Sequence, residues 1–187
     1  PAVAFDALTG RTEGLIALDG AGGSPLSRHL LDGSSMVETH LAAMKSLFDG
    51  RLYLELQRHG QSFERVLEPR VLKLATAHNL PIVATNDAHF STGDQFDAHD
   101  VLSCIAQGVT LSHRDRKRLT PEHYFKTCQD MTRLFSDLPE AVENTWRIAQ
   151  RCAVMPRLHD PILPAFDDGS GENEVQMLVR MAKEGLQ

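Results

Sequence analysis

The chain has 187 residues, of which 42% are hydrophobic and 24% are charged, proportions typical of a soluble globular protein that can build its own core. Its 19 Lys and Arg side chains and 25 Asp and Glu side chains give a formal net charge of −6, which argues against binding nucleic acid through an overall positive field but leaves room for a local site. The three cysteines form no C-x-x-C pair, and the apolar runs are too short to span a bilayer. We therefore expect a cytoplasmic protein with reduced thiols and no membrane partner.

The first half of the chain predicts strands and helices in alternation. Short apolar runs that end at turn residues predict buried strands, and apolar side chains at helical spacing predict the helices between them. The expected strands are 13–20, 52–57 and 81–85, and the expected helices are 25–32, 35–48 and 68–79. Ser35 and Glu38 have capping-box spacing, and Pro69 would lie in a first helical turn. This alternation predicts an α/β fold with a parallel sheet, either open or closed into a barrel.

The second half is mainly helical in pattern. Thr120, Thr127 and Asp137 each precede an acidic residue at a spacing that predicts a helix start. Further helices are expected at 97–107 and 175–186, with a Pro- and Gly-containing linker at 156–171. Because the chain begins with Pro1 and not with Met, we expect a fragment or a processed piece.

Polar side chains follow two of the predicted strands directly. His59 comes after the strand 52–57, and Asp87 and His89 come after the strand 81–85. The carboxyl ends of parallel strands open on one side of the sheet, so these side chains should converge there. Imidazole and carboxylate groups together suit Zn, Mn or Fe, so the pattern predicts a metal site. The alternative interpretation is that the two histidines only hydrogen-bond to the backbone at the strand ends.

The remaining motifs carry less chemistry. Among the nine histidines, His99 is near enough in sequence to join His89. The basic run 113–118 could contact a phosphate backbone or an acidic partner, or it could be a solvated loop. The sequence contains no phosphate-loop motif and no paired aspartates on a strand of the kind a two-metal nucleotidyl transferase needs, so we assign no catalytic residue.

Several stretches, taken together and in order, resemble the PHP domain of bacterial replicative DNA polymerase III alpha subunits. They are YLELQRHG (53–60), LPIVATNDAHF (80–90), AHDVLSCIAQG (98–108), RLTPEHYFKT (118–127), LFSDLPEAVENTWRIAQRC (134–152) and PILPAF (161–166). The resemblance covers essentially the whole chain from about Glu13 onward.

The resemblance implies part of a distorted seven-stranded β/α barrel. On this interpretation 1–110 holds the later strands and helices of the barrel, 111–155 is a helical extension, and 156–187 is a linker and first helix leading toward the polymerase palm. His59, Asp87 and His89 match the family's metal-binding positions, with Zn or Mn expected in the intact domain. The family's early H-x-H motif and its middle ligands would precede Pro1.

The resemblance also implies function. The parent chain would be a DNA-directed DNA polymerase that acts in replication, with Mg at a polymerase site outside this chain. Its PHP domain would bind metal and could act as a phosphoesterase or 3′–5′ exonuclease, and its partners would be DNA, the proofreading exonuclease subunit and other replicase subunits. The alternative is a non-catalytic scaffold that docks the proofreading subunit and stabilises the polymerase. A free-standing PHP phosphatase of small metabolites is a weaker third interpretation.

Overall fold

The computed structural model describes residues 4–116, 118–161, 164 and 168–186. These residues divide into two compact units, Pro1–Cys152 and Ala153–Gln187. Lys117 of the basic run and most of the PILPAF stretch lie outside the described residues.

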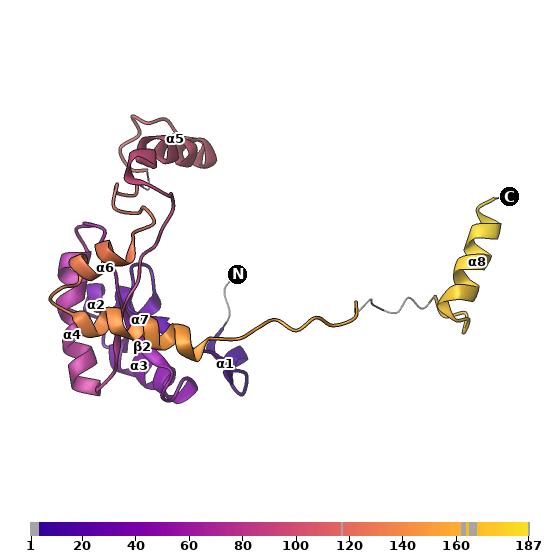
Figure 1. Ribbon diagram of the computed structural model, residues 1–187, viewed down its shortest axis with the longest axis horizontal. Coiled ribbons are helices and arrows are strands. Elements are labelled where there is room, and N and C mark those ends of the chain that lie inside the picture. Colours follow the sequence, from indigo (N-terminus) through magenta and orange to yellow (C-terminus); the bar gives the residue numbers. More distant parts are fainter. Residues whose placement is uncertain (1–3, 117, 162–163, 165–167, 187) are drawn as a thin grey trace. The chain divides into compact units, whose positions relative to one another are not determined.

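A parallel sheet of three strands forms the centre of the first unit (Figure 1). The strands are β1 (Ala17–Asp19), β2 (Leu52–Leu56) and β3 (Ile82–Ala84), in the order β1-β2-β3. Leu18 pairs with Tyr53, and Glu55 pairs with Val83. All the strands fall inside the predicted ones, so the predicted α/β class with a parallel sheet is confirmed.

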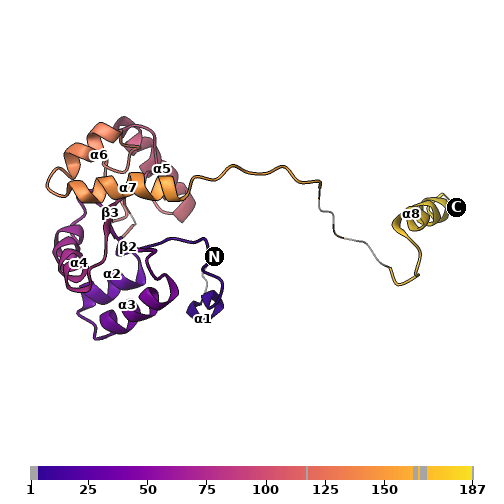
Figure 2. The same ribbon diagram turned by 60° about the horizontal axis from the view of Figure 1, so that its bottom comes forward.

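Helices pack against the strands of this sheet on two sides (Figure 2). They are α2 (Pro25–Asp32), α3 (Met36–Leu47), α4 (Glu64–His78), α6 (Cys128–Leu134) and α7 (Pro139–Arg151), preceded by the short α1 (Phe5–Leu8). The helices α2 and α4 pack against β1 and β2, and α7 packs against β3. Figure 2 shows α2, α3 and α4 grouped at one end of the unit, with α6 and α7 at the other and the strands between them. One core includes Leu26, Leu54, Val71, Phe135 and Ala141.

Residues in the left-handed conformation end several helices. Gly33 ends α2 and Gly108 ends α5 (Phe96–Gln107), both with φ 65°, and Asn79 ends α4 with φ 50°. Thr127 and Asp130 form a complete capping box at the start of α6.

Two predicted caps and one predicted first-turn proline are wrong. Ser35 makes no side-chain cap, because the neighbouring Ser34 hydroxyl accepts the Met36 N–H at 3.1 Å. The helix α4 begins at Glu64, so Pro69 lies inside it and not in its first turn. The carboxylate of Asp137 does not cap α7, because it binds Arg58.

The predicted helix after Thr120 does not form. The Thr120 hydroxyl donates to the carbonyl oxygen of His59 at 2.6 Å. The chain then runs beside the segment that follows β3, where Phe90 and Tyr124 form a parallel bridge and the Phe125 N–H donates to Phe90 O at 2.8 Å. Long-range pairing therefore prevails over the local helix signal.

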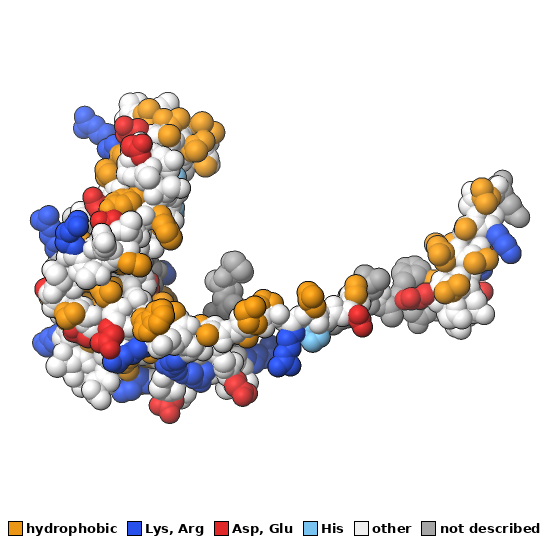
Figure 3. Space-filling model, in the orientation of Figure 1, with side chains coloured by type: hydrophobic (Ala, Val, Ile, Leu, Met, Phe, Trp, Pro, Cys, Tyr) orange, Lys and Arg blue, Asp and Glu red, His pale blue; other side chains and the backbone are white. Residues whose placement is uncertain are grey.

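A short 3-10 turn, η1 (Gly93–Gln95), leads into α5 (Phe96–Gln107), the helix predicted at 97–107. Its apolar side chains are largely exposed: Val101 by 42%, Leu102 by 64% and Ile105 by 71%. Figure 3 shows hydrophobic side chains gathered over this helix.

The second unit contains α8 (Glu174–Glu184), which starts with a capping box of Asn173 and Gln176. Arg180 on this helix pairs with Asp168, Glu172 and Glu184. Among the helices of the described part of the chain, none has the length and apolar character needed to cross a membrane.

Candidate functional site

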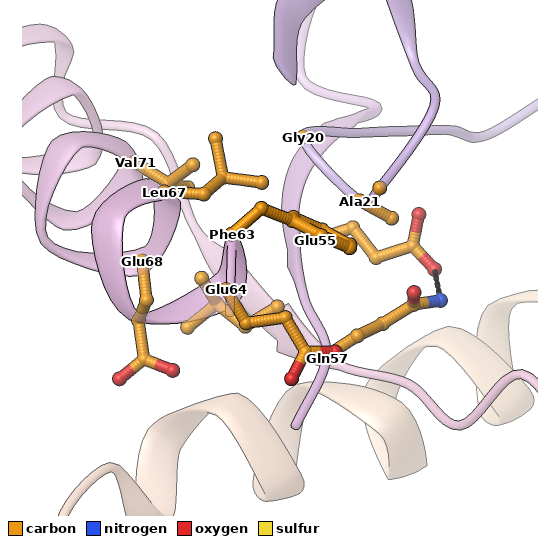
Figure 4. Close-up of a pocket in the computed structure, with 11 residues that line it drawn as sticks. Gly20, Ala21, Glu55, Gln57, Phe63, Glu64, Leu67, Glu68 and Val71 are labelled. Carbon is orange, nitrogen blue, oxygen red and sulfur yellow. Dashed lines mark hydrogen bonds between the residues drawn. The ribbon is translucent and has the colours of Figure 1, made fainter. Parts of the chain in front are cut away.

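His59 lies just beyond the end of β2 and is only 2% exposed. The chain turns at Gly60 with φ 77°, a left-handed conformation that glycine adopts without strain. Glu64, the first residue of α4, reaches back to the histidine: its Oε1 lies 3.1 Å from His59 Nδ1. The backbone N–H of His59 donates to both Glu64 carboxylate oxygens, at 3.0 and 2.9 Å. In Figure 4 the Glu64 side chain extends from the start of α4 toward the end of β2, beside Gln57.

The charge of the Glu64 carboxylate is sustained by these contacts. Burial raises the pKa of Glu64, but hydrogen bonds from the ring and backbone of His59 and from the Gln61 N–H outweigh it and hold that pKa below its usual range. Sequence reasoning missed Glu64, because it lies where a loop was expected between the strand and the helix. The sequence does offer one signal for Glu64, which is its position five residues after the histidine at the end of the strand.

The other ring nitrogen of His59 faces the segment after β3. Nε2 lies 3.2 Å from Asn86 Oδ1 and 3.3 Å from the backbone nitrogen of Asp87. The Asn86 amide in turn donates to Tyr124 O at 2.7 Å. The ends of β2 and β3 are therefore joined through a histidine ring, as the parallel arrangement of the strands predicted.

Asp87 and His89 lie in the open part of the site. His89 Nε2 is 3.1 Å from Asp87 Oδ2. The His89 side chain is 38% exposed and the Asp87 side chain is 56% exposed. Their contact brings the two side chains together at a turn of the backbone, where the Ala88 N–H donates to Asn86 O at 3.0 Å.

Two more histidines join the site. The His123 ring stacks on the His59 ring with centroids 4.0 Å apart, and the His89 ring lies 5.9 Å from His123 and 5.5 Å from His99. Burial and the neighbouring His59 lower the pKa of His123. The sequence places His99 near enough to His89 to join the site, whereas the helix expected after Thr120 would put His123 in its first turn. No local pattern reveals His123, because the pairing of Phe90 with Tyr124 brings it there.

One open cleft collects these side chains. It is lined by His59, Glu64, Asp87, His89, His99 and His123, with Gln61, Ser103 and Arg118 among the other polar residues. The cleft therefore contains all three predicted metal-binding residues.

The donor set fits a metal ion only in part. Imidazole and carboxylate are suitable donors for Zn or Mn, and Asp87 and His89 are adjacent and accessible. Both ring nitrogens of His59, in contrast, have hydrogen-bonding partners. Within the part of the chain that the structure describes, no group of three or more His, Cys, Asp or Glu side chains is arranged to hold a metal ion. The fit is therefore limited to the Asp87–His89 pair.

The basic run is mostly engaged by its own neighbours. Arg116 binds the buried carboxylate of Asp100 through both terminal nitrogens, and Arg118 lies 3.4 Å from the same carboxylate and 5.3 Å from the centroid of the Phe96 ring. Only Arg118 of this run lines the cleft among the described residues.

A scan against family models found no match for this chain. Curated relatives, in contrast, match over its whole length. The chain is 43% identical over 187 residues to DNA polymerase III subunit alpha of Caulobacter vibrioides, covering 100% of this chain. It is 40% identical over 189 residues to the Escherichia coli K12 protein of the same name, and 37% identical over 188 residues to that of Rickettsia bellii.

The chain spans only about 16% of the length of each of these relatives. Throughout its own length, this chain is therefore similar to one segment of the much longer DNA polymerase III alpha subunits.

Proposed function

We propose that this chain is a segment of a bacterial replicative DNA polymerase alpha subunit, and that the parent protein carries out DNA-directed DNA synthesis in the cytoplasm. The observation that carries the proposal is the similarity over 98–100% of the chain to three proteins of that name. DNA and the other replicase subunits, including the proofreading exonuclease, would be partners of the parent chain, and Mg would act at its polymerase site.

Within the parent chain we assign 1–110 to a PHP-type barrel, 111–155 to its helical extension and 156–187 to the passage toward the polymerase region. The parallel strands and their polar carboxyl ends support the first assignment. The division of the described residues near Cys152 supports a boundary between the second and third.

Primer extension tests the assignment to a polymerase. The full-length protein is expected to extend a primed DNA template with Mg, whereas the 187-residue chain alone is expected to give no extension, because it lacks paired aspartates on a strand. Extension by the 187-residue chain, or none by the full-length protein, would contradict the proposal.

We further propose that Asp87 and His89 are donors to a divalent-metal site, Zn or Mn, with His59 beside them and the remaining donors supplied by other parts of the parent chain. The accessible pair at the end of β3 supports this assignment. A metal bound there would activate water and stabilise negative charge on a phosphate group. Glu64 and Asn86 would hold His59 in place, and Arg118 would offer a positive charge at the cleft.

The metal content of the full-length protein checks the donor assignment. His89→Ala is expected to weaken metal binding by about tenfold or more, because it removes an accessible imidazole. His78→Ala is the matched control, since His78 lies on α4 and pairs with Glu38 away from the cleft. Equal metal content in the wild type and His89→Ala would refute the assignment. Normal metal content without any metal-dependent nuclease activity would indicate the scaffold role.

A further inference from the structure

The surroundings of His59 differ from those of Asp87 and His89. The His59 side chain is 2% exposed, whereas the Asp87 and His89 side chains are 56% and 38% exposed. The His123 ring covers one face of the His59 ring at 4.0 Å. His59 lines the cleft, but its side chain offers almost no exposed surface to anything bound there.

Both edges of the His59 ring are also engaged. Nδ1 faces the Glu64 carboxylate at 3.1 Å, and Nε2 lies 3.2 Å from Asn86 Oδ1 and 3.3 Å from the Asp87 nitrogen. A zinc ligand needs a nitrogen lone pair about 2.0–2.1 Å from the metal. Here each nitrogen is directed at another group of the protein.

The contacts join β2 and β3 in either protonation state of the ring. In the neutral form, Nδ1–H donates to Glu64 and Nε2 accepts the Asp87 N–H. In the charged form, Nε2–H donates to Asn86 Oδ1 instead. The segment 86–87 is held through His59 in both cases.

The segment 120–123 also contacts the ends of both strands. The Thr120 hydroxyl donates to His59 O at 2.6 Å, and the His89 N–H donates to His123 O at 2.8 Å. The backbone on each side of Asp87 is thus fixed, on one side through the His59 ring and on the other through His123.

We infer that His59 is a positioning residue: together with Glu64 it forms a bracket that fixes the backbone at Asn86 and Asp87 and thereby orients the Asp87–His89 pair toward the cleft. The functional meaning of the bracket rests on the proposed metal site, but its existence does not. The bracket can therefore be tested without metal.

Hydrogen–deuterium exchange of the full-length, metal-free protein, followed by mass spectrometry, is the test. In His59→Leu, peptides that cover 85–90 are expected to exchange roughly tenfold faster, because the Asp87 N–H and Asn86 Oδ1 lose their contact with the ring. His59→Gln is expected to restore most of the protection, because its amide can donate or accept at the position of Nε2. A role in filling space alone would make Leu and Gln behave alike.

The controls separate local from general effects. His78→Leu makes the same chemical change on α4, where His78 is half-buried, and is expected to leave exchange at 85–90 unchanged. If His59→Leu raises exchange throughout the protein, the variant has lost general stability, and Glu64→Gln then serves as the test of the local contact. Glu64→Gln removes the carboxylate charge that faces His59 Nδ1. If Glu64 and His59 form the bracket, exchange should become faster only at 57–61 and 85–90.

Unchanged exchange at 85–90 in both His59→Leu and Glu64→Gln would overturn the inference. A zinc anomalous-diffraction peak about 2.0–2.1 Å from His59 Nε2 would overturn it as well, since His59 would then be a ligand. A protein that binds no metal but shows the expected exchange would refute the proposed metal site and leave the bracket standing.

Discussion

Replacing Arg58 with alanine is expected to lower the free energy of unfolding by about 3 kcal/mol. The guanidinium binds both carboxylate oxygens of Glu68 at 2.6 and 2.8 Å, both oxygens of Asp137 at 2.7 and 2.8 Å, and Leu134 O at 2.7 Å. It also lies 4.5 Å from the centroid of the Phe135 ring. One side chain thus ties the end of β2 to α4, α6 and the start of α7.

The partners explain the size of the effect. Hydrogen bonds that Arg58 donates to the carboxylates of Asp137 and Glu68 raise the pKa of Arg58 further above its usual value, so the guanidinium remains charged. Its side chain is 20% exposed and that of Glu68 is 22% exposed, so removing the arginine would leave the Glu68 carboxylate without its bidentate partner in a largely enclosed position. The ring of Phe135, which is 0% exposed, would lose its cover.

Urea unfolding monitored by far-ultraviolet circular dichroism measures the loss. Arg147→Ala is the control, because Arg147 pairs with Glu143 across one turn of α7 and both side chains are about 60% exposed. That pair is expected to contribute less than about 0.5 kcal/mol. Similar losses for the two variants would show that Arg58 does not act as a central connection.

The sheet and most of the helices could be predicted because their signals are local. Buried runs such as 52–57 and 81–85 need no partner to be recognised as strands. Cap residues such as Gly33, Asn79 and Thr127 act on the backbone within a few residues of themselves. These predictions therefore depend on no knowledge of the fold.

Two of the wrong predictions, those at Asp137 and Thr120, share a physical cause, which is competition from a distant partner. Asp137 has a suitable position for a cap, but the guanidinium of Arg58 is a stronger partner than a backbone N–H. Thr120 has the sequence of a helix start, but its hydroxyl finds the carbonyl oxygen of His59. Periodicity at Val101, Leu102 and Ile105 predicted the helix α5 correctly, yet the described residues leave these side chains largely exposed.

The candidate site, too, has a part that the sequence predicts and a part that depends on distant contacts. Topology alone placed His59, Asp87 and His89 near one another, because parallel strands end on the same side. Their different roles depend on contacts of His59 with Glu64, Asn86 and His123, of which the last arises from a long-range pairing that no spacing in the sequence encodes.

Asp100→Asn is expected to lower the free energy of unfolding by about 3 kcal/mol near neutral pH, and this loss should shrink in acid. Asp100 on α5 is 6% exposed, and Arg116 holds its carboxylate through two hydrogen bonds, one of 2.8 Å. These bonds lower the pKa of Asp100. The stabilisation is therefore fully present above the unfolded-state pKa of about 3.9 and is lost as the pH falls through the lower folded-state value.

Urea unfolding of the wild type and Asp100→Asn between about pH 7 and about pH 3 measures this dependence. Asp97→Asn makes the same change at an exposed position in the first turn of α5 and is expected to cost about 0.5 kcal/mol or less. A wild-type advantage that stays constant down to about pH 3 would mean that the charge of Asp100 contributes nothing to it. A narrowing advantage would show instead that the charged pair of Asp100 with Arg116 stabilises the fold.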